Sequence, residues 1–206
     1  MEYTKKLPTT DKELSTQLLG DGWEKIWEPR NLAFAMLLSV PFVFLLGSIT
    51  LWLAYLLQPR LFGFISSESF EISFNIDLKL LLFIVVIFAY MLIHELIHAA
   101  FIPNFSKSGK TFWGLNGLFG FVFTTEPIKK GRFIIISIMP FIVLSLVPLY
   151  LLNFFSLLNW YTVVLCLINA TGSCVDFLNV ILIAFQVKCG HTIINNGFET
   201  YHRLIK

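Results

Sequence analysis

The sequence predicts an all-α membrane protein with about four transmembrane helices and a β-hairpin between the second and third spans. The chain has 206 residues, of which 56% are hydrophobic and only 14% charged, and its mean hydropathy is +0.76. This composition is more apolar than that of soluble domains and is typical of a protein that crosses the membrane several times. Long apolar runs predict the helices, and a short aromatic stretch with several glycines predicts the hairpin.

Four apolar runs are long enough to cross a bilayer, which takes about 20 helical residues. They cover residues 31–58, 78–102, 133–158 and 160–187. We therefore divide the chain into an N-terminal tail (1–30), a four-span membrane domain (31–187) and a C-terminal tail (188–206). In the first tail, Thr10 to Glu13 fits a capping box and Gly20 fits a helix end, so a short helix is expected there.

The distribution of basic residues predicts the orientation of the chain. Lysine and arginine concentrate in the N-terminal tail, in the loop after the second span and in the C-terminal tail, whereas the link between the third and fourth spans has no charge. By the positive-inside rule, both termini are cytoplasmic, and the protein is a multi-pass protein of the cell membrane. The net charge of +2 reflects these topology signals and does not indicate a nucleic-acid partner.

Residues 111–123, between the second and third spans, do not show a helical pattern. Asn116-Gly117 lies between two short apolar and aromatic runs, which is a strong signature of a β-hairpin. Open-edged backbone enters a membrane only against protein or a wet cavity, so the hairpin either re-enters the membrane beside the end of the second span or lies at the membrane surface. A free strand edge can pair with an extended peptide. The residues expected to offer that edge to a substrate are Thr111, Phe112, Trp113, Gly114, Leu115, Asn116 and Gly117.

The second span contains three ionisable residues near its end, namely His94, Glu95 and His98. Each such group at membrane depth costs about 3 kcal/mol on insertion scales, so ionisable groups there usually mark function. Residues i and i+4 lie on one face of a helix, so both imidazoles can bind one zinc ion. Glu95 lies about 100° round the helix. There a carboxylate can act as the catalytic base on a water molecule. We expect one zinc ion per chain.

A catalytic zinc ion usually has three protein ligands, so a third residue is needed. Apart from Glu95, only Asp176 is an acidic residue well inside an apolar run. His94 and His98 lie about 21 and 27 Å from the start of their span, and Asp176 about 24 Å from the start of its own, at ~1.5 Å per residue. Because these two spans run in the same direction, the similar depth favours Asp176. The alternatives, all outside the spans, are His191, Glu199, His202 and Glu126.

Polar and small residues form a stripe along the fourth span. Asn169, Gly172, Ser173 and Asp176 share one helical face by their spacing. Gly172 and Ser173 would let this helix approach the second span closely. Asn169 and Ser173 are candidates for orienting a ligand or a substrate, and a plain hydrogen bond between helices is an equal alternative for Asn169.

The HELIH string at 94–98, together with NATGSCVD at 169–176, resembles the putative zincin peptidases, a family of small bacterial membrane proteins. The resemblance covers roughly residues 78–187. More distantly, the chain is similar to the site-2 class of intramembrane metalloproteases, although Phe177 follows Asp176 where those enzymes usually have glycine. The resemblance implies a bacterial cell membrane, zinc bound by His94, His98 and Asp176, and catalysis by Glu95.

The residues and the resemblance together predict a membrane-embedded zinc metalloprotease. It would hydrolyse peptide bonds in or near the inner leaflet, with a peptide or a membrane protein as substrate. Two other functions remain open, a divalent-cation transporter that carries zinc and a non-catalytic membrane scaffold. The lack of an evident internal repeat disfavours the transporter. The scaffold is disfavoured because hydrogen bonds between membrane helices contribute only about 0.6 kcal/mol. Substrate identity and oligomeric state are not predicted.

Overall fold

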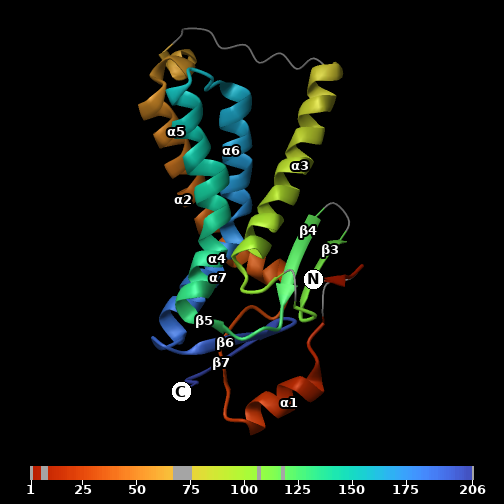
Figure 1. Ribbon diagram of the computed structural model, residues 1–206. Helices are drawn as coiled ribbons and strands as arrows, with labels where there is room; N and C mark the ends of the chain where they lie inside the picture. Colours follow the sequence, from red (N-terminus) through yellow and green to blue (C-terminus); the bar gives the residue numbers. More distant parts are fainter. Residues whose placement is uncertain (1, 6–8, 67–75, 106–107, 117–118, 206) are drawn as a thin grey trace.

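The computed structural model describes residues 2–5, 9–66, 76–105, 108–116 and 119–205. Four long apolar helices form a bundle, and two small β-sheets lie toward one end of it (Figure 1). Both chain termini lie in this same half of the molecule, which we call the sheet end. The described chain is mostly helical, as predicted, and each of the four helices is long and apolar enough to cross a membrane.

The first two apolar helices are uninterrupted and begin at side-chain caps. Helix α2 covers Leu32–Leu57 and helix α3 covers Leu78–Phe101. The side chains of Asn31 and Asp77 accept hydrogen bonds from backbone N–H groups in the first turns of these helices. Such caps satisfy donors that have no partner within the helix, so both helices start where the sequence places a short polar residue before an apolar run.

The third apolar helix changes its winding in the middle. It consists of α4 (Lys130–Phe141), a π-helical turn η2 (Ile142–Leu146) and α5 (Val147–Phe154). It begins and ends earlier than the predicted span 133–158. The chain after α5 turns at Ser156, whose positive φ of 57° is incompatible with a continuing α-helix. Single π-turns inside α-helices are frequent at functional sites.

The fourth apolar helix is interrupted at Ser173, which separates α6 (Trp160–Gly172) from α7 (Cys174–Gln186). The side chain of Ser173 donates a hydrogen bond to the carbonyl of Asn169, one turn earlier. A serine that bonds back in this way often bends a helix. The interruption makes Asp176 a first-turn residue of α7. A 3₁₀ helix, η1 (Pro59–Ser66), follows α2 and packs its Phe62 ring against Trp160 at the start of α6.

The predicted hairpin is present and consists of the antiparallel strands β3 (Thr111–Asn116) and β4 (Phe119–Thr124). The predicted turn residue Gly117 lies outside the described residues. Strand β4 packs beside the half of α3 nearest the sheet end (Figure 1). On its other side, β3 pairs in parallel with the short strand β1 (Glu2–Tyr3), so the sheet order is β1-β3-β4.

This order corrects the expectation that Thr111 to Gly117 would offer an open edge. Strand β3 lies in the middle of the sheet, and its Phe112 and Trp113 are already paired with β1. The outer edge of the hairpin that faces α3 belongs to β4 instead. The sequence pattern of a hairpin gives no indication of a third strand from a distant segment, which is why the edge was assigned to the wrong strand.

A second sheet, which the sequence analysis missed, joins four distant segments at the sheet end. Its strands are β2 (Glu24–Lys25), β5 (Ile128–Lys129), β6 (Thr192–Asn196) and β7 (Glu199–Arg203), in the order β2-β7-β6-β5. The fold is therefore not purely α plus one hairpin, and residues 188–206 are not a plain tail. Asn196-Gly197 is the same kind of turn signal as Asn116-Gly117, and it could have predicted this hairpin.

The N-terminal segment packs onto this sheet. The expected helix is present as α1 (Lys12–Gly20), with Asp11 and not Thr10 as its N-cap. Its Leu18 packs with Trp23 and Tyr201. Burial alone would raise the pKa of Glu199, but hydrogen bonds from Lys25, Tyr201 and Ser15 outweigh it and lower this pKa to about 2. Helix α1, strand β2 and strand β7 are thus linked through one carboxylate.

Candidate metal centre

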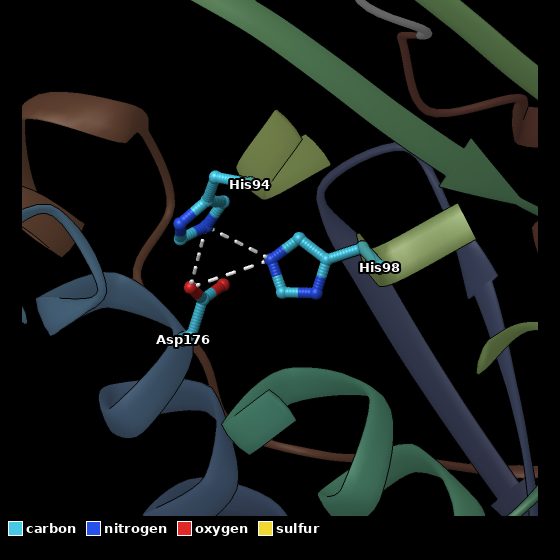
Figure 2. Close-up of side chains that lie close together, drawn as sticks. All are labelled: His94, His98 and Asp176. Atoms are coloured by element: carbon cyan, nitrogen blue, oxygen red, sulfur yellow. Dashed lines mark hydrogen bonds and ion pairs between the residues drawn. The ribbon is translucent and has the colours of Figure 1, made fainter. Parts of the chain in front are cut away.

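Three side chains from two helices converge on one point within the bundle. His94 and His98 lie one turn apart on α3, and Asp176 reaches them from the first turn of α7 (Figure 2). The Nε2 atoms of the two histidines are 3.1 Å apart. They lie 3.3 and 3.4 Å from Oδ2 of Asp176. Among the residues that the structure describes, this is the one group of three His, Cys, Asp or Glu side chains placed to hold a metal ion.

The spacing of these three atoms fits a tetrahedral ion. Bonds of about 2.0–2.1 Å, as zinc forms with His nitrogen and carboxylate oxygen, place neighbouring ligand atoms roughly 3.3 Å apart at tetrahedral angles. The three observed distances, 3.1, 3.3 and 3.4 Å, lie close to that value. Three protein ligands leave a fourth position open, which is the arrangement of catalytic zinc sites and not of closed structural ones.

Asn169 determines which nitrogen of His94 faces the site. The Asn169 amide nitrogen donates to the Pro140 carbonyl and to Oγ of Ser145, and Ser145 in turn donates to the Cys166 carbonyl. The Asn169 oxygen is therefore left as the acceptor, 2.9 Å from Nδ1 of His94. With its proton on Nδ1, His94 presents the lone pair of Nε2 to the cluster.

His98 is oriented by a backbone carbonyl that a proline leaves free. Its Nδ1 donates to the carbonyl of Ile136 in α4, at 2.8 Å. In a regular α-helix that carbonyl would accept the N–H of the residue four positions later, which here is Pro140 and has no N–H. The carbonyl is thus available to His98, and the Nε2 lone pair of His98 also points to the cluster.

A second proline-freed carbonyl is used about two turns earlier on α3. The hydroxyl of Tyr90 donates to the Leu144 carbonyl at 2.5 Å, and Pro148 occupies the position four residues after Leu144. Tyr90, His94 and His98 are successive residues of one face of α3, and each bonds to the third or fourth apolar helix. The sequence indicated that Pro140 and Pro148 can kink their span, but it assigned no role at the site to them, to Tyr90 or to Ser145.

The donor set itself requires a cation. With both Nδ1 protons engaged, two nitrogen lone pairs and a carboxylate oxygen face one another at close range. Such an arrangement is repulsive unless a proton or a metal ion lies among the three atoms. Two neutral imidazoles and one carboxylate, each oriented by its surroundings, suit a zinc ion in their chemistry.

Glu95 lies beside the cluster and against the hairpin. Its carboxylate lies within electrostatic reach of all three candidate ligands and beside the backbone of Val122 in β4. A Cβ atom added to Gly120 would lie only 2.9 Å from Cγ of Glu95. The close approach of β4 to Glu95 therefore depends on glycine at position 120, a role that the sequence analysis did not identify.

Basic side chains of α4 cap both ligand-bearing helices. Arg132 donates to the carbonyl of Phe101, the last residue of α3. Lys130 donates to the carbonyls of Ala184 and Val187 at the end of α7. Cations are stabilising at helix C-termini, where carbonyls lack partners. These residues, interpreted from the sequence only as topology signals, thus join the two helices that meet at the cluster.

The close packing predicted for the polar stripe is present. A Cβ atom at Gly172 would lie 3.5 Å from the methyl carbon of Met91 in α3, so α6 and α3 approach each other closely at this point. Asn169 bonds to His94, whereas Ser173 bonds to the Asn169 carbonyl and not to a candidate ligand.

The rival third ligands lie elsewhere. His191, just before β6, faces His202 of β7, with their Nδ1 atoms 3.0 Å apart. Glu199 is paired with Lys25, and Glu126 accepts from Ser108. The structure therefore brings Asp176, and none of these alternatives, to the two histidines of α3.

The fold and this cluster define a helical protein that could cross a membrane and that carries one candidate metal centre between its helices. The chain belongs to the family described as Putative zincin peptidase, whose family model matches residues 87–190. The match contains the cluster, Glu95, Asn169 and the whole β3–β4 hairpin. No curated protein and no solved structure matches the chain.

Proposed function

We propose that this chain is a membrane-embedded zinc metallopeptidase that cleaves peptide bonds near the inner leaflet. The observation that carries the proposal is the convergence of two histidines with oriented tautomers and one aspartate. Glu95 lies beside this cluster but is not one of its three candidate ligands. The family membership supports peptide hydrolysis, and the four apolar helices support a membrane location.

His94, His98 and Asp176 would hold one zinc ion. When bound, zinc lowers the pKa of a water molecule to about 7 and polarises the carbonyl to be cleaved. Glu95 accepts a proton from the attacking water and returns it to the leaving nitrogen. Val122 and Gly120 of β4 lie beside Glu95, on the hairpin side of α3.

The edge of β4 that pairs with no described strand is the place where an extended substrate would lie, between β4 and α3. A peptide bond within a helix is hydrogen-bonded and shielded, so the substrate must be extended before hydrolysis, and pairing with a strand edge keeps it so. We propose that the hairpin re-enters the membrane with its β4 edge toward the substrate, and that the sheet end faces the cytoplasm.

The test is the zinc content of the purified protein in detergent, with His94→Ala and Asp176→Ala beside the wild type. We expect about one zinc per chain in the wild type and loss of zinc in both variants, because two ligands bind zinc much more weakly than three. Zinc retained by Asp176→Ala would contradict the three-ligand site.

Catalysis by Glu95 is tested separately. Glu95→Gln should retain zinc, since Glu95 is not one of the three candidate ligands. The variant should lose cleavage of a protein substrate, because an amide cannot accept the proton. Cleavage by a preparation of this variant free of wild-type enzyme would refute the mechanism. Uptake of labelled zinc into proteoliposomes would favour the transporter instead.

A further inference from the structure

A cavity of about 240 Å³ lies between the start of α2, helix α7 and the turn between β6 and β7. Along α7 it is lined from Val175, the neighbour of Asp176, to Ile183, a distance of ~12 Å by the helical rise. On the hairpin side it reaches Phe123, the neighbour of Val122. The metal-site residues do not line the cavity, but Val175 and Asn179 place it within about one helical turn of Asp176 along α7, from where it runs toward the sheet end.

The cavity is lined by an amide side chain that bonds to none of the described residues. Asn179 lies three residues after Asp176 on α7, is half-buried and lines the cavity. Its side chain forms no hydrogen bond with the described part of the chain, whereas Asn169, one helix earlier, has every polar atom bonded. A polar group in an apolar helix costs free energy unless it is satisfied, so an unpaired amide that faces a cavity indicates a ligand that pairs with it.

The other end of the cavity carries a carboxyl group. Glu28 lines it and accepts hydrogen bonds from the backbone N–H and the hydroxyl of Thr200. The described residues that line the cavity include no lysine or arginine, and Lys25 nearby is paired with Glu199. Burial has the largest effect on Glu28 and raises its pKa, whereas the hydrogen bonds from Thr200 and the charge of Lys25 lower it.

We propose that this cavity binds the substrate on the sheet-end side of the cleaved bond, with Asn179 paired to a backbone peptide group and Glu28 to a lysine or arginine. An asparagine amide offers one donor and one acceptor side, which match the C=O and N–H of a peptide group. The apolar wall, which includes Phe133 and Leu182, takes the intervening side chain.

The substrate class follows from this charge. Segments that leave a membrane toward the cytoplasm are enriched in lysine and arginine, so a membrane protein presents an apolar stretch followed by a basic residue. The cavity has a matching arrangement, with the apolar wall and Asn179 along α7 and Glu28 at the other end. This inference rests on the proposed function, because the peptide is the substrate of that reaction.

The experiment measures binding, independently of cleavage, in the Glu95→Gln protein in detergent. The probes are two short dansyl-labelled peptides of alternating leucine and alanine, one ending in Lys-Arg and the other in Glu-Asp. We expect the Lys-Arg peptide to bind about tenfold more tightly, as one charge-assisted hydrogen bond allows. Glu28→Gln should remove this preference, and Asn179→Ala should weaken both peptides by about tenfold.

Matched controls are Glu24→Gln, an exposed carboxylate of β2, and Asn153→Ala in α5, neither of which lines the cavity. Both should bind like the parent protein. The inference is overturned if the parent protein binds both peptides equally. It is also overturned if Glu28→Gln and Asn179→Ala bind the peptides as the control variants do. Zinc content and cleavage are measured on the same substitutions in the Glu95 background. If the expected binding differences are absent while the protein with Glu95 intact binds zinc and cleaves, the cavity assignment is wrong and the proposed function still stands.

Discussion

The amide of Asn169 connects the metal centre to the third apolar helix. It is fully buried, and its two donors and one acceptor reach Pro140, Ser145 and His94. Residues that hydrogen-bond to metal-binding histidines fix the ring orientation and the tautomer. Asn169 is thus the residue on which the direction of the His94 lone pair depends.

Asn169→Ala should weaken zinc binding about 10–100-fold, because His94 loses the acceptor for its Nδ1 proton. Competition with a chelator would measure this. Asn169→Asp, which keeps an oxygen acceptor, should lie closer to the wild type, and Asn153→Ala should not differ from it. Unchanged zinc affinity in Asn169→Ala would mean that His94 is oriented without it.

Gly120 is the corresponding residue on the hairpin side. Gly120→Ala should leave zinc binding intact but lower cleavage at least about tenfold, because the added methyl group displaces Glu95, and a small misplacement of a catalytic group is costly. The matched control is Gly131→Ala, whose Cβ would meet no atom within 4 Å. If both variants cleave equally well, the contact between Gly120 and Glu95 has no role in catalysis.

At the scale of the helices, prolines and a π-turn are the features that position the centre. Pro140 and Pro148 each stand four residues after a carbonyl that a side chain of α3 uses, and η2 lies between them. A regular helix would engage those carbonyls internally. The third apolar helix thus gives up internal hydrogen bonds and gains hydrogen bonds to the helix that carries both histidines.

Pro140→Ala should lower zinc affinity about tenfold or more, since the new N–H competes with His98 for the Ile136 carbonyl. Replacing zinc with cobalt gives a second measurement, since a reoriented His98 changes the visible absorption of the bound ion. Pro41→Ala in α2 is the control, as Pro41 also lies inside an apolar helix. An unaltered cobalt spectrum in Pro140→Ala would show that His98 does not need this carbonyl.

At the scale of the whole molecule, the two sheets and both termini occupy one end of the bundle (Figure 1). The orientation of this end relative to the membrane stays a prediction from the basic residues. The exposed Cys189 lies between α7 and β6, at this end, whereas Cys166 is buried and Cys174 partly buried in the fourth apolar helix.

A variant with Cys166→Ala and Cys174→Ala should therefore react with a membrane-impermeant maleimide in inverted vesicles and not in intact cells. The reason is that a cytoplasmic Cys189 is sheltered by the membrane in cells and accessible in inverted vesicles. A further Cys189→Ser substitution should abolish the labelling. Reaction in intact cells would place both termini outside.

The sequence by itself determined the four apolar helices, the β3–β4 hairpin and the residues that can bind a metal. These features depend on composition, periodicity and turn residues, which are local and can be recognised without knowledge of the fold. His94 and His98 share a face because of their spacing, and Asp176 stood out because an isolated carboxylate inside an apolar helix is costly.

Only the tertiary structure decided how distant segments meet. The edge strand of the hairpin is β4 and not β3, because Glu2 and Tyr3 pair with β3. The second sheet joins segments that lie between residues 24 and 203. The partners of the histidines are an amide on α6 and a carbonyl left free by a proline on α4. Such contacts depend on the packing of whole helices, since a hydrogen bond requires atoms within about 3 Å. No local pattern in the sequence specifies that distance between residues far apart in the chain.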